Sequence, residues 1–396
     1  MREAVRRSSA VPERRHRTSR TTRLLAAALA LPLVAAGLLA VAAPAQAATG
    51  PVVRVSMGDS YISGEAGRWK GNSDTASGSR DGTDRAWTGG STYDPTTVYG
   101  STYASGCDRS DSAEINSLAG AVNIACSGAT TANVFRAGNG GQSFKGEAPQ
   151  ADQLASIAAN NTVKLITLSI GGNDLGFSDV ISTCVKDYLI WYSYCHTSQQ
   201  SAIDSRMSAA MAGVGKSIDE IRAVMTADGY ASGDYRIVLQ SYPSPIPRST
   251  EMRYPESGWS RASTGGCPFW NGDADWARDS MVPQISNALA GVAATKGVQF
   301  MDLRDMLQGR EVCAKTSSLA TPGAAPSATT SEWARFVDAG LSSSQGTVQE
   351  SMHPNYYGEL ALGSCLTQLN AHPTGNYYYC RNTAGRDSTG MYLNAK

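Results

Sequence analysis

Five short apolar runs alternate with amphipathic stretches along this chain, and this alternation limits its fold more than any other feature. The runs cover residues 52–56, 122–125, 163–170, 235–240 and 298–303. The stretches with a helical pattern lie around residues 112–120, 150–159, 201–227, 276–296 and 356–370. A repeated strand–helix order predicts a parallel sheet with helices on both faces. The nearly continuous apolarity of the runs fits such buried strands, so we predict an α/β fold with a central five-stranded parallel sheet.

The first 47 residues have the three parts of a secretory signal peptide. Eight arginines lie within residues 1–23, an apolar stretch covers residues 24–43, and Pro44-Ala45-Gln46-Ala47 forms a small-residue cleavage site. This order predicts cleavage after Ala47 and a secreted product. The alternative is an uncleaved membrane anchor, because the stretch is long enough to span a bilayer. Its alanine-rich composition and the cleavage site favour secretion, and we expect residues 48–396 to form a single domain.

Removal of this leader makes the remaining chain acidic. The sequence has 34 basic and 34 acidic residues, of which residues 1–47 hold eight and two. The difference leaves 26 basic and 32 acidic residues, a formal net charge of about −6. Phosphate binding needs clustered Lys and Arg, so we expect no nucleic-acid partner. No other stretch is long and apolar enough to cross a membrane, and we expect a monomer.

All eight cysteines follow the leader, and an even number in an exported chain indicates a disulfide framework. They are Cys107, Cys126, Cys184, Cys195, Cys267, Cys313, Cys365 and Cys380. Roughly a hundred pairings are possible, and we favour sequence neighbours because short loops close locally. That choice gives 107–126, 184–195, 267–313 and 365–380. There is neither a Cys-x-x-Cys nor a His-Glu-x-x-His motif, so we expect no metal site and no cofactor.

Three loop insertions interrupt the strand–helix pattern, around residues 61–106, 184–195 and 241–275. The first and third mix Gly, Ser, Thr, Asp and Pro with scattered aromatic residues. The second is a segment rich in aromatic residues between two cysteines. The simpler interpretation is that they are irregular surface connections. The alternative is that the aromatic side chains of the first and third loops form the walls of a cleft for an acyl chain or sugar rings.

Four motifs carry residues suited to acyl transfer, and three of them follow predicted strands. They are Met57-Gly58-Asp59-Ser60, Cys126-Ser127-Gly128-Ala129-Thr130, Gly171-Gly172-Asn173-Asp174 and Glu350-Ser351-Met352-His353-Pro354. Sites in parallel α/β folds form at the carboxyl ends of strands. Ser60, Gly128 and Asn173 follow the first three strands, so we expect them to meet at one edge of the sheet.

Ser60 is the predicted nucleophile and His353 the predicted base. A serine hydroxyl needs a base to remove its proton, and histidine is the usual one. Of the three histidines after the leader, His196 lies beside Cys195 at the end of the second loop insertion and lacks an acidic residue near it in sequence. His372 follows a predicted helix close to the C-terminus. His353 has Glu350 three residues before it, and we therefore predict His353.

The base needs an acceptor that fixes its tautomer, and the sequence places this role at residue 350. Either the Glu350 carboxylate or its backbone carbonyl fits, and the sequence does not separate the two. For the developing oxyanion we predict the backbone N–H groups of Ser60 and Gly128 and the side-chain amide of Asn173. Asp59 and Asp174 are expected to hold loops in place through backbone amides.

These four motifs resemble those of the SGNH, or GDSL-type, hydrolases, and in particular secreted actinobacterial lipases and esterases. The stretches 123–131 and 168–177 are similar to the second and third conserved blocks of that group. The resemblance extends from residue 52 to about residue 366. It implies a flavodoxin-like three-layer sandwich, ester hydrolysis through an acyl-serine and no metal in the chemistry. It also supports disulfides between sequence neighbours and assigns the roles given above to Ser60, Gly128, Asn173 and His353. Many relatives carry aspartate where this chain has Glu350, and some use a main-chain carbonyl.

The leading functional hypothesis is a secreted serine ester hydrolase that acts on lipids, phospholipids or other acyl esters. One alternative keeps the enzyme but makes its substrate an acetylated polysaccharide, because the fold family includes carbohydrate acetylesterases. Another is a non-catalytic extracellular binding protein on the same scaffold. The joint presence of nucleophile, base and oxyanion donors disfavours that last hypothesis.

Overall fold

The computed structural model describes residues 49–396 except 76–78, 192, 339–345 and 373. The chain separates into two units, Met1–Ala43 and Pro44–Lys396, and the first lies outside the described residues. The predicted signal peptide of residues 1–47 lies outside them as well. Within the described residues, no helix has the length and apolarity needed to span a membrane.

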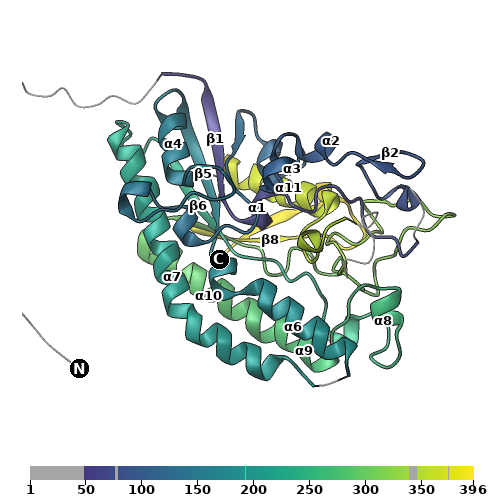
Figure 1. Ribbon diagram of the computed structural model, residues 1–396. Helices are drawn as coiled ribbons and strands as arrows, with labels where there is room; N and C mark the ends of the chain where they lie inside the picture. Colours follow the sequence, from purple (N-terminus) through teal and green to yellow (C-terminus); the bar gives the residue numbers. More distant parts are fainter. Residues whose placement is uncertain (1–48, 76–78, 192, 339–345, 373) are drawn as a thin grey trace, which may run out of the picture. The chain divides into compact units, whose positions relative to one another are not determined.

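The five predicted strands form the parallel core of the sheet (Figure 1). They are β1 (Val52–Gly58), β4 (Ala121–Asn123), β5 (Thr162–Ser169), β6 (Arg236–Gln240) and β7 (Gln299–Asp302). Their order is β4-β1-β5-β6-β7, and each neighbouring pair is parallel. This is the flavodoxin-like order of a doubly wound sheet, in which ligands bind at the carboxyl ends of the strands where the order reverses. Here that point lies between β1 and β5.

The sheet has seven strands rather than the predicted five. β8 (Tyr377–Arg381) pairs parallel to β7, and β9 (Tyr392–Ala395) pairs antiparallel to β8. Both were missed because their side chains are only partly buried: β9 is the edge strand of the sheet and β8 lies next to it. β8 alternates buried and half-buried residues and is rich in tyrosine, so it has no continuous apolar run. The α/β class and the parallel core are confirmed.

Two groups of helices cover the sheet (Figure 1). Among the described residues, the α-helices are α1 (Ser60–Ser63), α2 (Thr96–Tyr99), α3 (Thr102–Ser105), α4 (Gln150–Ala158), α5 (Gly172–Leu175), α6 (Phe177–Leu189), α7 (His196–Ala227), α8 (Ser260–Ser263), α9 (Asn271–Trp276), α10 (Val282–Lys296) and α11 (Tyr356–Ala371). The helices α4, α7 and α10 pack on one another and against β5, β6 and β7. The other face is covered by α11, which contacts β8, β9 and the 3-10 helix Glu114–Ser117 of the connection from β1 to β4.

We predicted a loop over residues 184–195, and this prediction is wrong for the first half of the segment. The first half of that segment is the last part of α6. Helix α6 is difficult to predict from residue propensity because Val, Ile, Ser, Thr and Cys are poor helix formers. The apolar positions Ile181, Val185 and Leu189 nevertheless repeat every four residues, which places them on one face of a helix.

The four predicted disulfides are present. They join Cys107 to Cys126, Cys184 to Cys195, Cys267 to Cys313 and Cys365 to Cys380. The first and third each join two loop segments, the second joins α6 to the start of α7, and the fourth joins α11 to β8. They therefore restrain the long connections around the sheet, including the one that carries the second motif.

Candidate active site

The serine lies where β1 ends and α1 begins. Gly58 has a φ of 130°, and a Cβ there would come within 1.8 Å of the Ser169 carbonyl oxygen on β5. Glycine is thus required for the close approach of these two strands. Asp59 caps α1 by accepting from the Tyr61 N–H at 3.2 Å. The turn leaves Ser60 at the start of the helix, with its hydroxyl 2.7 Å from Nε2 of His353.

His353 is oriented by a backbone carbonyl. Its Nδ1 lies 3.0 Å from the carbonyl oxygen of Ser351, which makes Nδ1 the protonated nitrogen and leaves Nε2 to accept the serine proton. The Tyr61 ring lies 4.7 Å from the imidazole, and its hydroxyl donates to the Met352 carbonyl at 3.0 Å. Burial lowers the pKa of His353 to about 4, against the opposite effect of nearby carbonyl groups. The imidazole is therefore neutral at neutral pH, as a base must be.

The structure does not bring the Glu350 carboxylate to the imidazole. One carboxylate oxygen accepts from the Tyr99 hydroxyl at 2.7 Å and the other from the Thr347 N–H at 2.9 Å. These contacts cap the 3-10 helix Val348–Glu350. The expected acceptor at residue 350 is thus replaced by the carbonyl of the next residue, Ser351. A one-residue difference of this kind depends on the local turn, which the sequence pattern does not specify.

The predicted oxyanion donors converge on the same edge of the sheet. Asn173, at the start of α5, lines a cleft together with Ser60 and His353, and its amide donates to the Ala129 carbonyl at 2.9 Å. Gly128 precedes Ala129 and is exposed, with a φ of 84°. Within the described residues, the backbone N–H groups of Ser60 and Gly128 donate to no protein acceptor. Both are therefore available to a developing negative charge.

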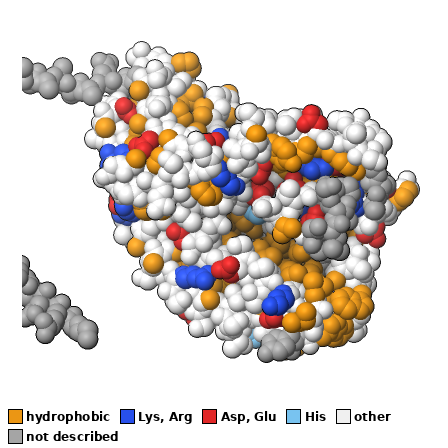
Figure 2. Space-filling view, viewed as in Figure 1, with side chains coloured by type: hydrophobic (Ala, Val, Ile, Leu, Met, Phe, Trp, Pro, Cys, Tyr) orange, Lys and Arg blue, Asp and Glu red, His pale blue; other side chains and the backbone are white. Residues whose placement is uncertain are grey.

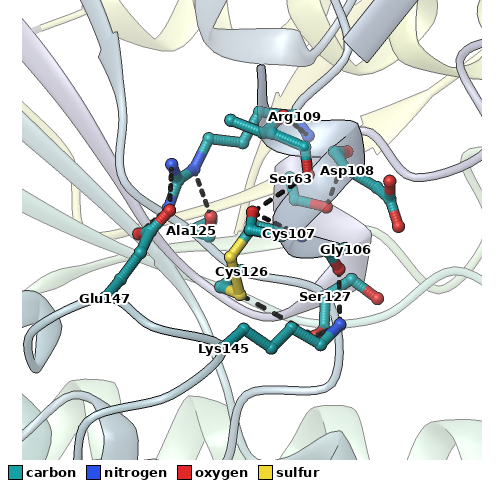
Figure 3. Close-up of a disulfide and its surroundings, with 12 residues drawn as sticks. Ser63, Gly106, Cys107, Asp108, Arg109, Ala125, Cys126, Ser127, Lys145 and Glu147 are labelled. Atoms are coloured by element: carbon teal, nitrogen blue, oxygen red, sulfur yellow. Dashed lines mark hydrogen bonds and ion pairs between the residues drawn. A yellow bond between two sulfur atoms is a disulfide. The ribbon is translucent and has the colours of Figure 1, made fainter. Parts of the chain in front are cut away.

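The second motif is held in place by a disulfide and two cationic side chains (Figure 3). Cys126 is bonded to Cys107, and its N–H donates to the Gly58 carbonyl at 3.0 Å. Arg109 donates to the Ala125 carbonyl at 2.6 Å, and Lys145 donates to the Ser127 carbonyl at 2.7 Å. These contacts fix the turn that presents Gly128.

Asp59 and Asp174 hold loops in place through hydrogen bonds, as expected from the sequence. Asp174 accepts from the backbone N–H and the hydroxyl of Thr131 at 3.0 and 2.7 Å. Asp59 also accepts from the Tyr242 hydroxyl at 2.5 Å, and that hydroxyl accepts from the Gly172 N–H at 2.9 Å. Burial raises the pKa of Asp59 to about 7 despite these hydrogen bonds. Sequence reasoning missed Tyr242, although its position just after β6 places it at the same edge of the sheet.

Glu65 is a second residue that sequence reasoning missed. It is 1% exposed, and one carboxyl oxygen lies 3.9 Å from Nε2 of His353 while accepting from the Ser127 hydroxyl. Among the described residues, the other oxygen is buried and has no hydrogen-bond partner. Burial raises the pKa of Glu65 well above its usual value. Its position five residues after Ser60, one turn beyond the nucleophile, is the signal that could have found it.

An apolar cleft of about 680 Å³ opens at Ser60 and His353. One wall is α6, with Phe177 and the aligned side chains Ile181, Val185 and Leu189. Figure 2 shows hydrophobic side chains lining this hollow. Of the described residues in the loops 61–106 and 241–275, Tyr61 alone lines it. The cleft wall is therefore a helix rather than the aromatic loops that the sequence suggested.

One cluster has metal-ligand residue types but is otherwise engaged. Among the described residues, Cys184, Cys195 and Asp273 lie within ligand distance of one another. The two cysteines form a disulfide. Asp273 accepts from the N–H groups of Cys195 and His196 and lies 2.7 Å from Nδ1 of His196. These groups cap the start of α7, and the His196 pairing is structural rather than part of the cleft.

A family comparison decides the assignment. The model of the GDSL-like lipase/acylhydrolase family matches residues 56–358, which include Ser60 and the three later motifs. The chain belongs to this family. It is thus a carboxylic ester hydrolase of the GDSL type, and the resemblance inferred from the motifs is confirmed. No match was found among curated proteins.

Several solved structures are similar to this GDSL hydrolase. An extracellular lipase from Streptomyces rimosus is 23% identical over 81% of this chain and 99% of its own, with a TM-score of 0.43. A phospholipase A1 from Streptomyces albidoflavus is 20% identical over 81% and 98%, with a TM-score of 0.44. A carbohydrate acetylesterase from Sinorhizobium meliloti is 13% identical over 67% and 89%, with a TM-score of 0.30. These identities are too low to extend any of the three substrates to this hydrolase.

Proposed function

We propose that this GDSL hydrolase is a secreted enzyme that cleaves esters of medium and long acyl chains, such as those of lipids and phospholipids. The apolar cleft beside Ser60 is the observation that carries the proposal. An acetyl group would occupy a small part of 680 Å³, whereas an extended acyl chain would contact the α6 side chains along its length. Burying each methylene contributes about 0.8 kcal/mol, so chain length should increase affinity until the wall ends.

In the proposed reaction, Ser60 attacks the ester carbonyl while Nε2 of His353 takes its proton. The Ser351 carbonyl keeps the proton on Nδ1 and so holds the reactive tautomer. The N–H groups of Ser60 and Gly128 and the amide of Asn173 stabilise the oxyanion. His353 then returns the proton to the leaving alcohol, and water hydrolyses the acyl-serine by the reverse sequence.

A series of chromogenic esters from acetyl to palmitoyl tests the proposal. We expect kcat/KM to rise with chain length and to vanish in Ser60→Ala. Val185→Phe, which narrows the cleft, should move the optimum to shorter chains. Thr183→Phe places the same phenyl ring on the same helix at a position that does not line the cleft and serves as the control. Turnover confined to the acetyl ester would instead favour a deacetylase of glycans.

Secretion is part of the same proposal and has a separate test. Four disulfides form readily in an oxidising compartment, and residues 1–47 have the composition of a signal peptide. We expect the enzyme recovered from culture medium to begin at Ala48 when its N-terminus is sequenced. Cell-bound protein that retains residues 24–43 would contradict secretion and support the membrane anchor.

A further inference from the structure

Four exposed apolar side chains form a patch beside the mouth of the cleft. Ile190, Trp191, Tyr194 and Trp259, here called the aromatic platform, are 56%, 49%, 52% and 53% exposed. Ile190 also lines the cleft, so the platform and the cleft are continuous. Figure 2 shows hydrophobic side chains extending from the hollow towards the region of α8. Exposed apolar patches of this kind mark interaction surfaces.

The platform is held in position rather than loosely attached. The rings of Trp191 and Trp259 contact each other with centroids 6.1 Å apart and an angle of 72° between their planes. The Tyr188 hydroxyl donates to the Gly258 carbonyl at 3.3 Å, which joins the end of α6 to the loop before α8. The Cys184–Cys195 disulfide closes the segment that carries Trp191. These restraints keep apolar side chains in water, which folding alone does not require.

The charged residues around the platform favour binding to a partner surface that has no net charge. In the described parts of segments 186–194 and 255–260, the charged residues are Lys186, Asp187 and Glu256. There is thus no cluster of cations in these parts that would select anionic lipid. Trp and Tyr are the residues that occupy the headgroup level of membranes, because their rings are apolar with a polar edge. Rings inclined at 72° also present no flat shared face for stacking on a sugar.

We propose that the aromatic platform docks the enzyme on a surface of zwitterionic phospholipid and places the cleft mouth against the acyl chains. This inference rests on the proposed function, since it supplies the form in which a lipid ester reaches the cleft. In this arrangement Ile190 lies at the boundary between the lipid surface and the cleft. Docking then raises activity on aggregated substrate, while activity on a dissolved ester depends on the cleft alone.

The test measures binding and activity separately. Ser60→Ala removes hydrolysis, so its sedimentation with phosphatidylcholine vesicles reports docking alone. In that background we expect Trp191→Ala and Trp259→Ala each to weaken vesicle binding about tenfold or more, as burial of an aromatic side chain predicts. With Ser60 restored, both variants should lose activity on vesicles and keep kcat/KM on a soluble butyryl ester. Trp87→Ala, which removes a tryptophan 41% exposed on β2 (Trp87–Gly89), is the matched control.

The possible outcomes separate this inference from the proposed function. Vesicle binding that is equal in Ser60→Ala with and without the two tryptophans would overturn the platform, even if long acyl esters are cleaved. Tryptophan-dependent binding to vesicles would support it even if the chain-length series failed. Binding to insoluble acetylated xylan, lost in Trp191→Ala, without binding to vesicles would assign the patch to polysaccharide and also overturn the inference.

Discussion

Replacing Glu350 by glutamine tests whether a carbonyl, rather than a carboxylate, orients the base. The Glu350 side chain is 4% exposed and uses its two oxygens to accept from the Tyr99 hydroxyl and the Thr347 N–H. Neither contact involves His353, whose Nδ1 has the Ser351 carbonyl 3.0 Å away. On this geometry Glu350→Gln should change kcat on a soluble butyryl ester by less than about threefold. Where a carboxylate does orient the base, its loss costs about 10⁴ in kcat.

The same substitution should reduce stability. A glutamine has one acceptor oxygen and no charge, so it cannot reproduce both charge-assisted contacts, although the Tyr99 hydroxyl keeps the Glu65 carbonyl as a second acceptor. Hydrogen bonds to charged groups contribute about 1.5–3 kcal/mol, and we expect the substitution to lose part of that. Burial lowers the pKa of Arg335 to about 9 while the charge of Glu350 opposes that effect, and removing the charge adds to the loss. We expect a lower unfolding midpoint in urea with unchanged activity of the folded protein.

The reasoning is refuted by the opposite pattern. A fall in kcat of about 10³ or more, in a variant whose unfolding transition and circular dichroism match the wild type, would mean that the carboxylate acts on the base. His353→Ala provides the reference for complete loss of the base. The comparison is made with saturating ester, so that a change in KM does not hide the effect on kcat.

Three further predictions concern the oxyanion, the base and a buried acid. Asn173→Ala should lower kcat by about 10²–10³ with little change in KM, which steady-state kinetics on a soluble ester measures. Because the pKa of His353 is about 4, kcat/KM should stay level from pH 8 to pH 5 and decline only as pH falls through about 4; a decline near pH 6.5 would contradict this. Burial raises the pKa of Glu114 to about 7. Its contribution to the free energy of unfolding is therefore complete below pH 4.5 and lost as pH rises through 7. Glu114→Gln should raise the free energy of unfolding by up to about 3 kcal/mol at pH 9 and by little at pH 4.5, which urea unfolding at these two pH values would show.

Most of the fold followed from apolar periodicity because the parallel core depends on it. A strand buried on both faces must be apolar along its length, so β1, β5 and β6 were visible as runs. The same argument explains what was missed. β8 is only partly buried and has a tyrosine-rich sequence, and α6 is built from residues with low helix propensity. In both, packing against neighbours determines the structure, and single-sequence patterns do not record those neighbours.

The arrangement of the candidate site followed from the sequence where it depends on residue type and motif order. Ser60, Asn173 and His353 are short polar residues at strand ends or before a helix, and topology brings them together. The orienting group could not be predicted because it is a backbone carbonyl, which every residue offers. Glu65 and Tyr242 were missed for a different reason. Each contacts the site through the fold, and neither belongs to a motif.

The geometry also indicates which groups contribute most to catalysis in the proposed mechanism. A pKa of about 4 makes His353 a weaker base than an ordinary imidazole, by roughly 3 kcal/mol in accepting the serine proton. The Ser351 carbonyl fixes the tautomer without supplying a full negative charge to stabilise the imidazolium. Stabilisation of the oxyanion must therefore carry a larger share of catalysis than in an enzyme with a carboxylate at Nδ1. The loss of activity should then rank His353→Ala and Asn173→Ala far above Glu350→Gln, and a rank in which Glu350→Gln exceeds Asn173→Ala would return the carboxylate to the mechanism.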